Sequence, residues 1–331
     1  MNIVQLDGYA ANPGDIDWKP WNEITMPDGS LCRFVVYDRT PRELVVERAK
    51  EADIVIINKV LMSEEVMAQL PRLKYIGVLA TGYNVVDIEA AKKRGIVVTN
   101  IPAYSTASVA QLVFAHILNI VNGVAVHSQS VSKGEWSHCP DFTYTITPQQ
   151  ELAGKRIGII GYGNTGKAVA TIAHAFGMKV LLAPSLRGGV EKRSNLPEYV
   201  TEAESLRQFF TEADIISLHC PLTDTTRHII NAESISLMKS HAIVINTGRG
   251  PLVDENALAE ALKSGKIAAA GVDVLEEEPP VNGSPLIGLS NCYVTPHIAW
   301  ATKEARQRLL KIAIENVEAF LYGKPQNQVT V

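Results

Sequence analysis

The sequence predicts an α/β protein with two doubly wound parallel-sheet domains. Two observations indicate this fold: short β-rich runs alternate with helix-length amphipathic segments, and a glycine-rich turn at 161–166 lies between a strand pattern and a helix pattern. Strands separated by helices need crossover connections, which give parallel sheets covered on both faces. With 331 residues, the chain is long enough for two such domains.

The first hundred residues predict a flavodoxin-like open sheet. Short apolar runs predict strands at residues 3–6, 33–37, 53–57 and 74–79. Amphipathic segments between or after them predict helices at residues 41–51, 63–70 and 86–94. A long apolar helix follows Pro102, with its most apolar part at 109–126. It contains Gln111, His116 and two asparagines, so we expect a buried helix and not a membrane span.

A second alternation of strand and helix patterns begins at Lys155. It predicts six strands, at residues 156–160, 180–183, 214–219, 242–246, 267–274 and 293–295. Six strands with intervening helices predict a second doubly wound sheet. An amphipathic pattern at 303–322 then predicts a final helix.

The composition excludes several classes of partner. With 31 Lys and Arg against 35 Asp and Glu, the formal net charge is −4, so we expect neither nucleic acid nor a membrane surface as a partner. The four cysteines are far apart and lack metal-ligand spacing, so we expect no structural metal. Without a secretory signal at the start, a reducing, cytoplasmic setting is expected.

The glycine-rich turn is the first motif that indicates chemistry. Gly161, Gly163 and Gly166, with Asn164 and Thr165 between them, directly follow an apolar strand pattern and directly precede a helix pattern. Glycines there allow a tight turn and close approach of a pyrophosphate, while the helix N-terminus supplies free N–H groups. The sequence therefore predicts a dinucleotide site.

The acidic residue that usually binds the adenosine ribose is missing. The next strand ends at Pro184, where that carboxylate is expected about 20 residues after the glycines. Its absence removes a like-charge barrier to a 2′-phosphate, and Ser185 and Arg187 could donate hydrogen bonds to one. We therefore favour NADP over NAD as the coenzyme, although Arg187 could equally be an ordinary solvated cation.

Further motifs resemble a known family. The segments 246–250 (NTGRG), Asp273 with 278–279 (EP), and 295–297 (TPH) occur in the order seen in D-isomer-specific 2-hydroxyacid dehydrogenases. The segments 81–87 (TGYNVVD) and 297–300 (HIAW) resemble the glycerate dehydrogenase, or hydroxypyruvate reductase, branch. The resemblance spans the whole chain and implies NAD(P)H-dependent reduction of a small 2-keto acid to a D-2-hydroxy acid.

The resemblance implies three catalytic side chains. His297 would give a proton to the new alkoxide, since an imidazole titrates near the working pH. Glu278 would hydrogen-bond His297 and favour the imidazolium. Arg249 would hold the substrate carboxylate and polarise its carbonyl, because a guanidinium is planar and permanently charged. Taken alone, each residue could be an ordinary surface or core side chain.

Other binding residues follow from the same resemblance. Backbone N–H groups of Thr81 and Gly82 would meet the substrate carboxylate, and Tyr104 and Trp300 would line the pocket or pack between domains. The remaining expected coenzyme contacts are Cys220, through its backbone, with Pro221, Thr247 and Asp273, which resembles the residue that accepts from the nicotinamide carboxamide.

The resemblance also implies a discontinuous domain order. Residues 1–99 and 299–331 would form the substrate-binding domain, and residues 100–298 would form an inserted NAD(P)-binding Rossmann domain. We expect a homodimer packed on the helix after Pro102, since that uncharged helix needs cover on both faces.

Alternatives stay open within and outside the enzyme class. D-Lactate and phosphoglycerate dehydrogenases share the chemistry. A dinucleotide-sensing, corepressor-like binding protein shares the architecture.

Overall fold

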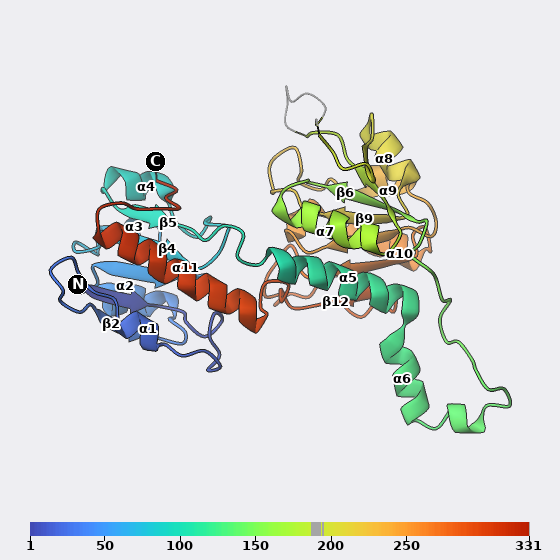
Figure 1. The fold of residues 1–331 in the computed structure, drawn as a ribbon, viewed down its shortest axis with the longest axis horizontal. Helices are drawn as coiled ribbons and strands as arrows, with labels where there is room; N and C mark the ends of the chain where they lie inside the picture. The colour runs from blue at the N-terminus through green and yellow to red at the C-terminus, as the bar shows by residue number, and fades with distance from the viewer. Residues whose placement is uncertain (187–192, 194, 331) are drawn as a thin grey trace. The chain divides into compact units, whose positions relative to one another are not determined.

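The structure, a computed structural model, describes residues 1–186, 193 and 195–330. The chain divides into two compact units: unit 1 is Met1–Ser105 with Ala301–Val331, and unit 2 is Thr106–Trp300 (Figure 1). Both divisions lie a few residues after the domain boundaries expected from the sequence, which follow residues 99 and 298. At the first of them, Ile101 N–H donates to the Ala80 carbonyl and Asn100 N–H to that of Asn327, so these residues belong with unit 1.

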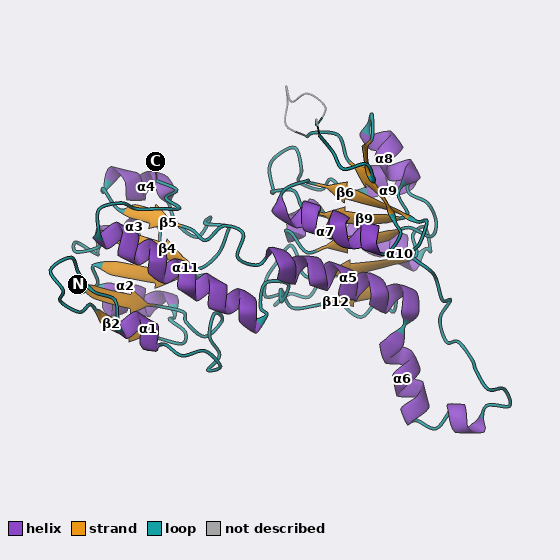
Figure 2. Ribbon diagram, in the orientation of Figure 1, coloured by secondary structure: helices purple, strands orange, loops and turns teal. Residues whose placement is uncertain are grey.

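Unit 1 contains a parallel sheet with the strand order β2-β1-β3-β4-β5 (Figure 2). This order is the flavodoxin-like one, as predicted. The strands are β1 (Asn2–Gln5), β2 (Arg33–Val36), β3 (Ile54–Ile57), β4 (Tyr75–Val78) and β5 (Val97–Thr99). The helices are α1 (Lys19–Asn22), η1 (Arg42–Leu44), α2 (Val45–Ala49), α3 (Glu64–Ala68), α4 (Ile88–Lys93) and α11 (Lys303–Leu321).

Burial and capping explain where these elements form. All four residues of β3 are buried apolar side chains, as expected for a strand covered on both faces. Helices α3 and α4 begin after Ser63 and Asp87, whose side chains accept hydrogen bonds from backbone N–H groups of the first turn. The last helix, α11, begins in the same way after Thr302.

The edge strand β5 was not predicted. It has three residues, which is too few for a strand periodicity to be visible. It is held from both sides, since it pairs with β4 and its Val98 carbonyl accepts from Val329 N–H near the C-terminus. Long-range pairing therefore makes this strand, and local sequence does not reveal it.

Unit 2 contains a seven-stranded parallel sheet with the order β12-β11-β10-β9-β6-β7-β8. Counted from β6, this is the doubly wound order of dinucleotide-binding domains, with a seventh strand added. The strands are β6 (Arg156–Ile160), β7 (Lys179–Leu182), β8 (Val200–Glu202), β9 (Ile215–Leu218), β10 (Ile243–Asn246), β11 (Ala269–Val272) and β12 (Cys292–Val294). The sequence missed only β8, another three-residue edge strand.

Helices cover both faces of the second sheet (Figure 1). The helices of unit 2 are α5 (Thr106–Asn122), α6 (Val124–Ser132), η2 (Trp136–His138), α7 (Asn164–Ala175), α8 (Leu206–Glu212), α9 (Ala232–Leu237), η3 (Gly250–Leu252) and α10 (Glu255–Lys263), and all but α6 and η2 lie against the sheet or its loops. Two doubly wound parallel sheets, with the second inserted in the sequence of the first, confirm the predicted fold class.

The apolar helix after Pro102 is broken in two, which corrects the continuous helix expected over 109–126. Gly123 has a φ of 56°, in the left-handed region, and α5 and α6 meet there at an angle of 55°. Helix α5 packs beside α7 and buries Val113 and Ile117, whereas α6 extends away from the sheet (Figure 1). In the described part of the chain no single helix is long and apolar enough to span a membrane, although the bent pair passes by length and composition.

Candidate active site

The glycine-rich turn joins β6 to α7 and forms a close-packed cradle. A Cβ on Gly161 would lie 2.4 Å from the backbone of His219, and one on Gly166 would lie 2.1 Å from the Gly161 carbonyl oxygen. Gly161 also has a φ of 98°. Gly163 faces open space, so a ligand could approach its backbone closely. Asn164 and Thr165 begin helix α7, whose N-terminus therefore faces the same turn.

A cavity of about 650 Å³ lies beside this turn at the carboxyl ends of β6, β7 and β9. Among the predicted coenzyme residues, it is lined by Gly161, Gly163, Ser185, Cys220 and Pro221. Its position next to β6, where the strand order reverses, is the usual ligand position in doubly wound sheets. Arg187 lies outside the described residues. Burial raises the pKa of the Cys220 thiol to about 11, which favours the protonated thiol over the thiolate at neutral pH.

One buried oxygen near this edge lacks a partner in the described part of the chain. Thr247 follows β10 and is 8% exposed, and its Oγ1 makes no hydrogen bond there. An unpaired buried hydroxyl in a native structure needs an explanation, and a bound polar ligand is one. The glycine cradle, the adjoining cavity and this hydroxyl all fit a dinucleotide.

His297 and Glu278 form a hydrogen-bonded pair, as the sequence predicted. Glu278 Oε2 lies 2.6 Å from His297 Nδ1, and both side chains are about one-third exposed. Glu278 Oε1 accepts from the Leu275 N–H at 3.0 Å, so the carboxylate is itself held in place. A carboxylate can only accept here, so Nδ1 carries a proton and Nε2 is the ring nitrogen left to act on another molecule.

Asp273 organises the turn that carries His297. It is 1% exposed, and its carboxylate accepts hydrogen bonds from Thr295 Oγ1 at 2.6 Å, Ile298 N at 2.9 Å and Ala299 N at 2.8 Å. In this structure the side chain is therefore used to hold the residues on either side of His297. The nicotinamide contact expected for Asp273 remains a prediction.

Arg249 lies in the loop after β10 and is exposed. Its guanidinium donates to the Gly248 carbonyl at 2.8 Å and has no carboxylate partner among the described residues. Gly250 brings this loop against the segment that carries Glu278, since a Cβ there would lie 1.8 Å from the Leu275 carbonyl oxygen. Leu275 thus contacts the Arg249 loop and also donates to Glu278, which ties the three predicted catalytic residues to one part of unit 2.

The predicted substrate residues lie in two units. Thr81 and Gly82 follow β4 in unit 1, and their backbone N–H groups have no partner among the described residues, so they could bind an anion. The Thr81 hydroxyl is already used, donating to the Ile101 carbonyl. Tyr104 is buried in unit 1 at 6% exposure, and Trp300 is the last residue of unit 2.

Sequence reasoning missed one residue that supports Glu278. Glu255, the first residue of α10, is 7% exposed, and its carboxylate accepts from Glu276 N at 2.7 Å and Ser284 Oγ at 2.5 Å. These bonds anchor both ends of the loop that contains Glu278. In the sequence, Glu255 is only an acidic residue in a first helical turn, so no local signal marks it.

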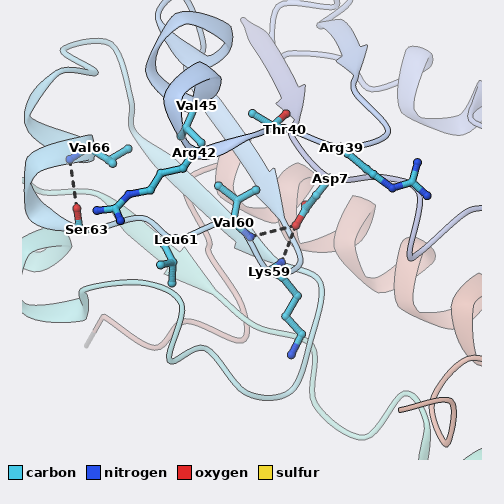
Figure 3. Close-up of a pocket in the computed structure, with 10 residues that line it drawn as sticks. All are labelled: Asp7, Arg39, Thr40, Arg42, Val45, Lys59, Val60, Leu61, Ser63 and Val66. Carbon is cyan, nitrogen blue, oxygen red and sulfur yellow. Dashed lines mark hydrogen bonds between the residues drawn. The ribbon is translucent and has the colours of Figure 1, made fainter. Parts of the chain in front are cut away.

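A second cavity, of about 370 Å³, lies in unit 1 at the ends of β1 and β3 (Figure 3). Asp7 forms one wall, and its carboxylate accepts from the backbone N–H of Lys59 at 2.6 Å and of Val60 at 3.1 Å. Burial raises the pKa of Asp7, and these hydrogen bonds act in the opposite direction. No local sequence pattern predicts this cavity, because its walls come from separated segments.

The second sheet, the glycine cradle and the partly exposed imidazole–carboxylate pair are together features of a nicotinamide-dinucleotide-dependent dehydrogenase. Comparison with known proteins agrees: the NAD-binding domain of D-isomer specific 2-hydroxyacid dehydrogenases matches residues 114–299. A hydroxypyruvate reductase of Blautia hydrogenotrophica is 47% identical over 99% of both chains. A glycerate dehydrogenase of Methylorubrum extorquens is 45% identical over 88% of this chain and 89% of its own.

A solved structure extends the likeness to the whole fold. The NADPH-dependent glyoxylate/hydroxypyruvate reductase of Sinorhizobium meliloti, solved with citrate, has a TM-score of 0.82 and 26% identity, covering 99% of this chain and 97% of its own. The chain belongs to the D-isomer-specific 2-hydroxyacid dehydrogenase family, whose members are NAD(P)-dependent oxidoreductases.

Proposed function

We propose that this enzyme reduces hydroxypyruvate and glyoxylate with NAD(P)H, forming D-glycerate and glycolate. The observation that carries the proposal is the 2.6 Å pair of Glu278 and His297, which leaves Nε2 of a partly exposed imidazole available. The names of the two relatives and of the Sinorhizobium meliloti reductase support this choice of substrates. In this proposal unit 2 binds the coenzyme and unit 1 is the substrate-binding domain.

The bound coenzyme would supply a hydride for C2 of the keto acid. Nε2 of His297 gives a proton to the carbonyl oxygen, so the carbonyl double bond becomes a C–H and an O–H bond. Glu278 keeps the proton on Nδ1 and stabilises the charged imidazole before the transfer. Arg249 binds the substrate carboxylate and polarises the carbonyl. We propose Thr81, Gly82, Tyr104 and Trp300 as further substrate contacts.

The coenzyme would be held mainly by unit 2. We propose that Gly161, Gly163, Gly166, Asn164 and Thr165 hold its pyrophosphate, because free N–H groups of a helix N-terminus favour phosphate. Cys220 and Pro221 line the same cavity, and Thr247 and Asp273 follow strands at the same edge.

A panel of keto acids tests the substrate proposal. The purified protein is mixed with NADPH or NADH and with hydroxypyruvate, glyoxylate, pyruvate or phosphohydroxypyruvate, and coenzyme oxidation is followed at 340 nm. We expect the largest kcat/KM for hydroxypyruvate or glyoxylate. A preference for pyruvate would indicate a D-lactate dehydrogenase, and one for phosphohydroxypyruvate a phosphoglycerate dehydrogenase. Coenzyme binding without turnover of any acid would favour a sensor.

We propose NADPH as the preferred coenzyme. The described lining of the 650 Å³ cavity includes Pro184, Ser185, Leu186 and Arg193, and no carboxylate. Arg193 pairs with Glu202 at 2.7 Å, so part of its charge is already balanced. Because Pro184 is uncharged, no negative side chain at this position would repel a 2′-phosphate.

Pro184→Asp is therefore expected to shift the preference towards NADH. A carboxylate at the end of β7 would repel a 2′-phosphate and accept from a ribose hydroxyl, so the NADPH/NADH ratio of kcat/KM should fall at least about tenfold, or about 1.4 kcal/mol. Pro184→Asn, of similar size and without charge, should change the ratio much less. If both variants keep the ratio of the unmodified enzyme, another segment sets the preference.

We propose that the enzyme is a homodimer, with the contact placed on the segment 124–146. This segment exposes Val124, Val131, Trp136, Phe142 and Ile146, with Phe142 at 88%. Solvent-exposed apolar groups gathered on one projecting segment are typical of an interaction surface. The contact expected on the helix after Pro102 stays a prediction: α5 buries Val113 and Ile117 within unit 2, and α6, which continues that helix, carries part of the exposed segment. Light scattering should give twice the chain mass.

We also propose a cytoplasmic location. It is supported by the four cysteines, all of which are unpaired, three of them buried.

A further inference from the structure

His116 is a buried histidine that the mechanism above does not use. It lies in the middle of α5 and is 4% exposed. Its imidazole packs against β11, where Gly271 makes room: a Cβ there would lie 2.7 Å from His116 Cβ. A buried polar side chain needs a hydrogen-bond partner, and the partner of His116 indicates the role of this histidine.

That partner is Thr295, two residues before His297. His116 Nε2 lies 3.2 Å from Thr295 Oγ1, and the Thr295 hydroxyl donates to Asp273 Oδ1 at 2.6 Å. The hydroxyl has one hydrogen, which it gives to Asp273, so it accepts from His116 and Nε2 carries the proton. Burial lowers the pKa of His116, and the charge of Asp273 acts in the opposite direction. A neutral ring with its hydrogen on Nε2 is sufficient to donate to the Thr295 hydroxyl.

The chain of bonds ends at the turn that carries His297. Asp273 accepts from the backbone N–H of Ile298 and Ala299, and the Asp273 carbonyl accepts from His297 N–H at 2.8 Å. His297 has a φ of 53°, a conformation that non-glycine residues adopt rarely. Surrounding contacts must therefore hold this turn, and the carboxylate of Asp273 supplies two of them.

We propose that His116 is a positioning residue, which orients Thr295 and, through it, the Asp273 carboxylate that holds the His297 turn. The kinetic part of this proposal rests on the proposed function, in which His297 gives the proton. If His116 served only to fill space, any apolar side chain of similar size would replace it. A positioning role requires a donor where Nε2 now lies.

Two substitutions separate these roles. His116→Met keeps an apolar side chain of similar size and removes the donor. His116→Gln restores an N–H donor at a similar distance from the backbone. Phe114→Leu is the matched control, because Phe114 is buried on the same helix and stacks on Phe176 with ring centroids 5.4 Å apart.

The first readout is amide hydrogen exchange, which needs neither coenzyme nor turnover. In His116→Met, the N–H groups of Ile298 and Ala299 should exchange at least about tenfold faster, because their acceptor is less firmly oriented. His116→Gln should bring the exchange back towards the rate of the unmodified enzyme, and Phe114→Leu should leave it unchanged in this turn. Equal exchange in the Met and Gln variants would overturn the proposal.

The second readout is the split between kcat and KM. His116→Met should lower kcat roughly tenfold, since small displacements of a catalytic group are costly. KM for the keto acid should change less than about twofold, because Arg249 is untouched. A change in KM alone, with kcat intact, would contradict the proposal.

Thr295→Val tests whether His116 acts through Thr295. This variant removes the hydroxyl that links the two groups, so the double variant with His116→Met should be no slower than Thr295→Val alone. Additive losses of kcat would contradict the relay. If the unmodified enzyme reduces no keto acid, the proposed function fails while the exchange experiment still decides the role of His116.

Discussion

Replacing His297 by Asn is expected to lower kcat for hydroxypyruvate by roughly 100-fold to 10,000-fold, the usual contribution of a general acid. Asn tolerates the positive φ of this position, so the turn should keep its shape. Its amide cannot give the proton that the new alkoxide needs. The dissociation constant of NADPH, measured by the fluorescence of the reduced ring, should change little.

His228 offers a matched control in the same unit. Its side chain is 40% exposed, it has a φ of 50°, and it lies 2.6 Å from a carboxylate oxygen of Glu276, so its local geometry resembles that of His297. His228→Asn should keep kcat within about twofold. If His297→Asn turns over as fast as the unmodified enzyme, His297 is not the acid.

Arg249→Met is expected to lower kcat/KM by roughly 100-fold to 1,000-fold, as found when a donor that stabilises developing charge is removed. Arg249 has no carboxylate partner among the described residues, so its charge is available for the substrate. KM should rise and kcat should fall, because the same guanidinium binds the substrate carboxylate and polarises its carbonyl.

Arg249→Lys keeps the charge but loses the planar pair of donors, so it should recover part of the loss and no more. Arg207→Met, an exposed arginine on α8, serves as the control and should keep kcat/KM within about twofold. Full activity in Arg249→Met would remove Arg249 from the mechanism.

The fold was predictable because buried parallel strands have a strong sequence signal. The run Ile54–Ile57 is entirely apolar, and the glycine turn at 161–166 marks the start of a helix. The signal fails where tertiary contacts make the structure, as in β5, which is completed by Val329, and β8. The helix break at Gly123 was also not predictable, because a helix can contain a glycine and the sequence does not reveal that this one has a positive φ.

The predicted pair of Glu278 and His297 lies within hydrogen-bond distance, but the supports of this pair were invisible in the sequence. Glu255 precedes its partner Glu276 by 21 positions, and His116 precedes its partner Thr295 by 179 positions. Only the packing of the sheet brings them to the same loops. Family resemblance marked the reacting groups, and the surrounding hydrogen bonds had to be seen in three dimensions.

The most direct test follows one hydrogen from the coenzyme to the product. The enzyme is incubated with hydroxypyruvate and NADPH doubly deuterated at C4 of the nicotinamide, and the glycerate is analysed by mass and by chirality. In the proposed reaction the hydride passes directly from the coenzyme to C2 of hydroxypyruvate, and His297 supplies the proton. This predicts D-glycerate with one deuterium, at C2, for each coenzyme oxidised. Glycerate of the L form, product without deuterium, or an intact coenzyme would contradict it.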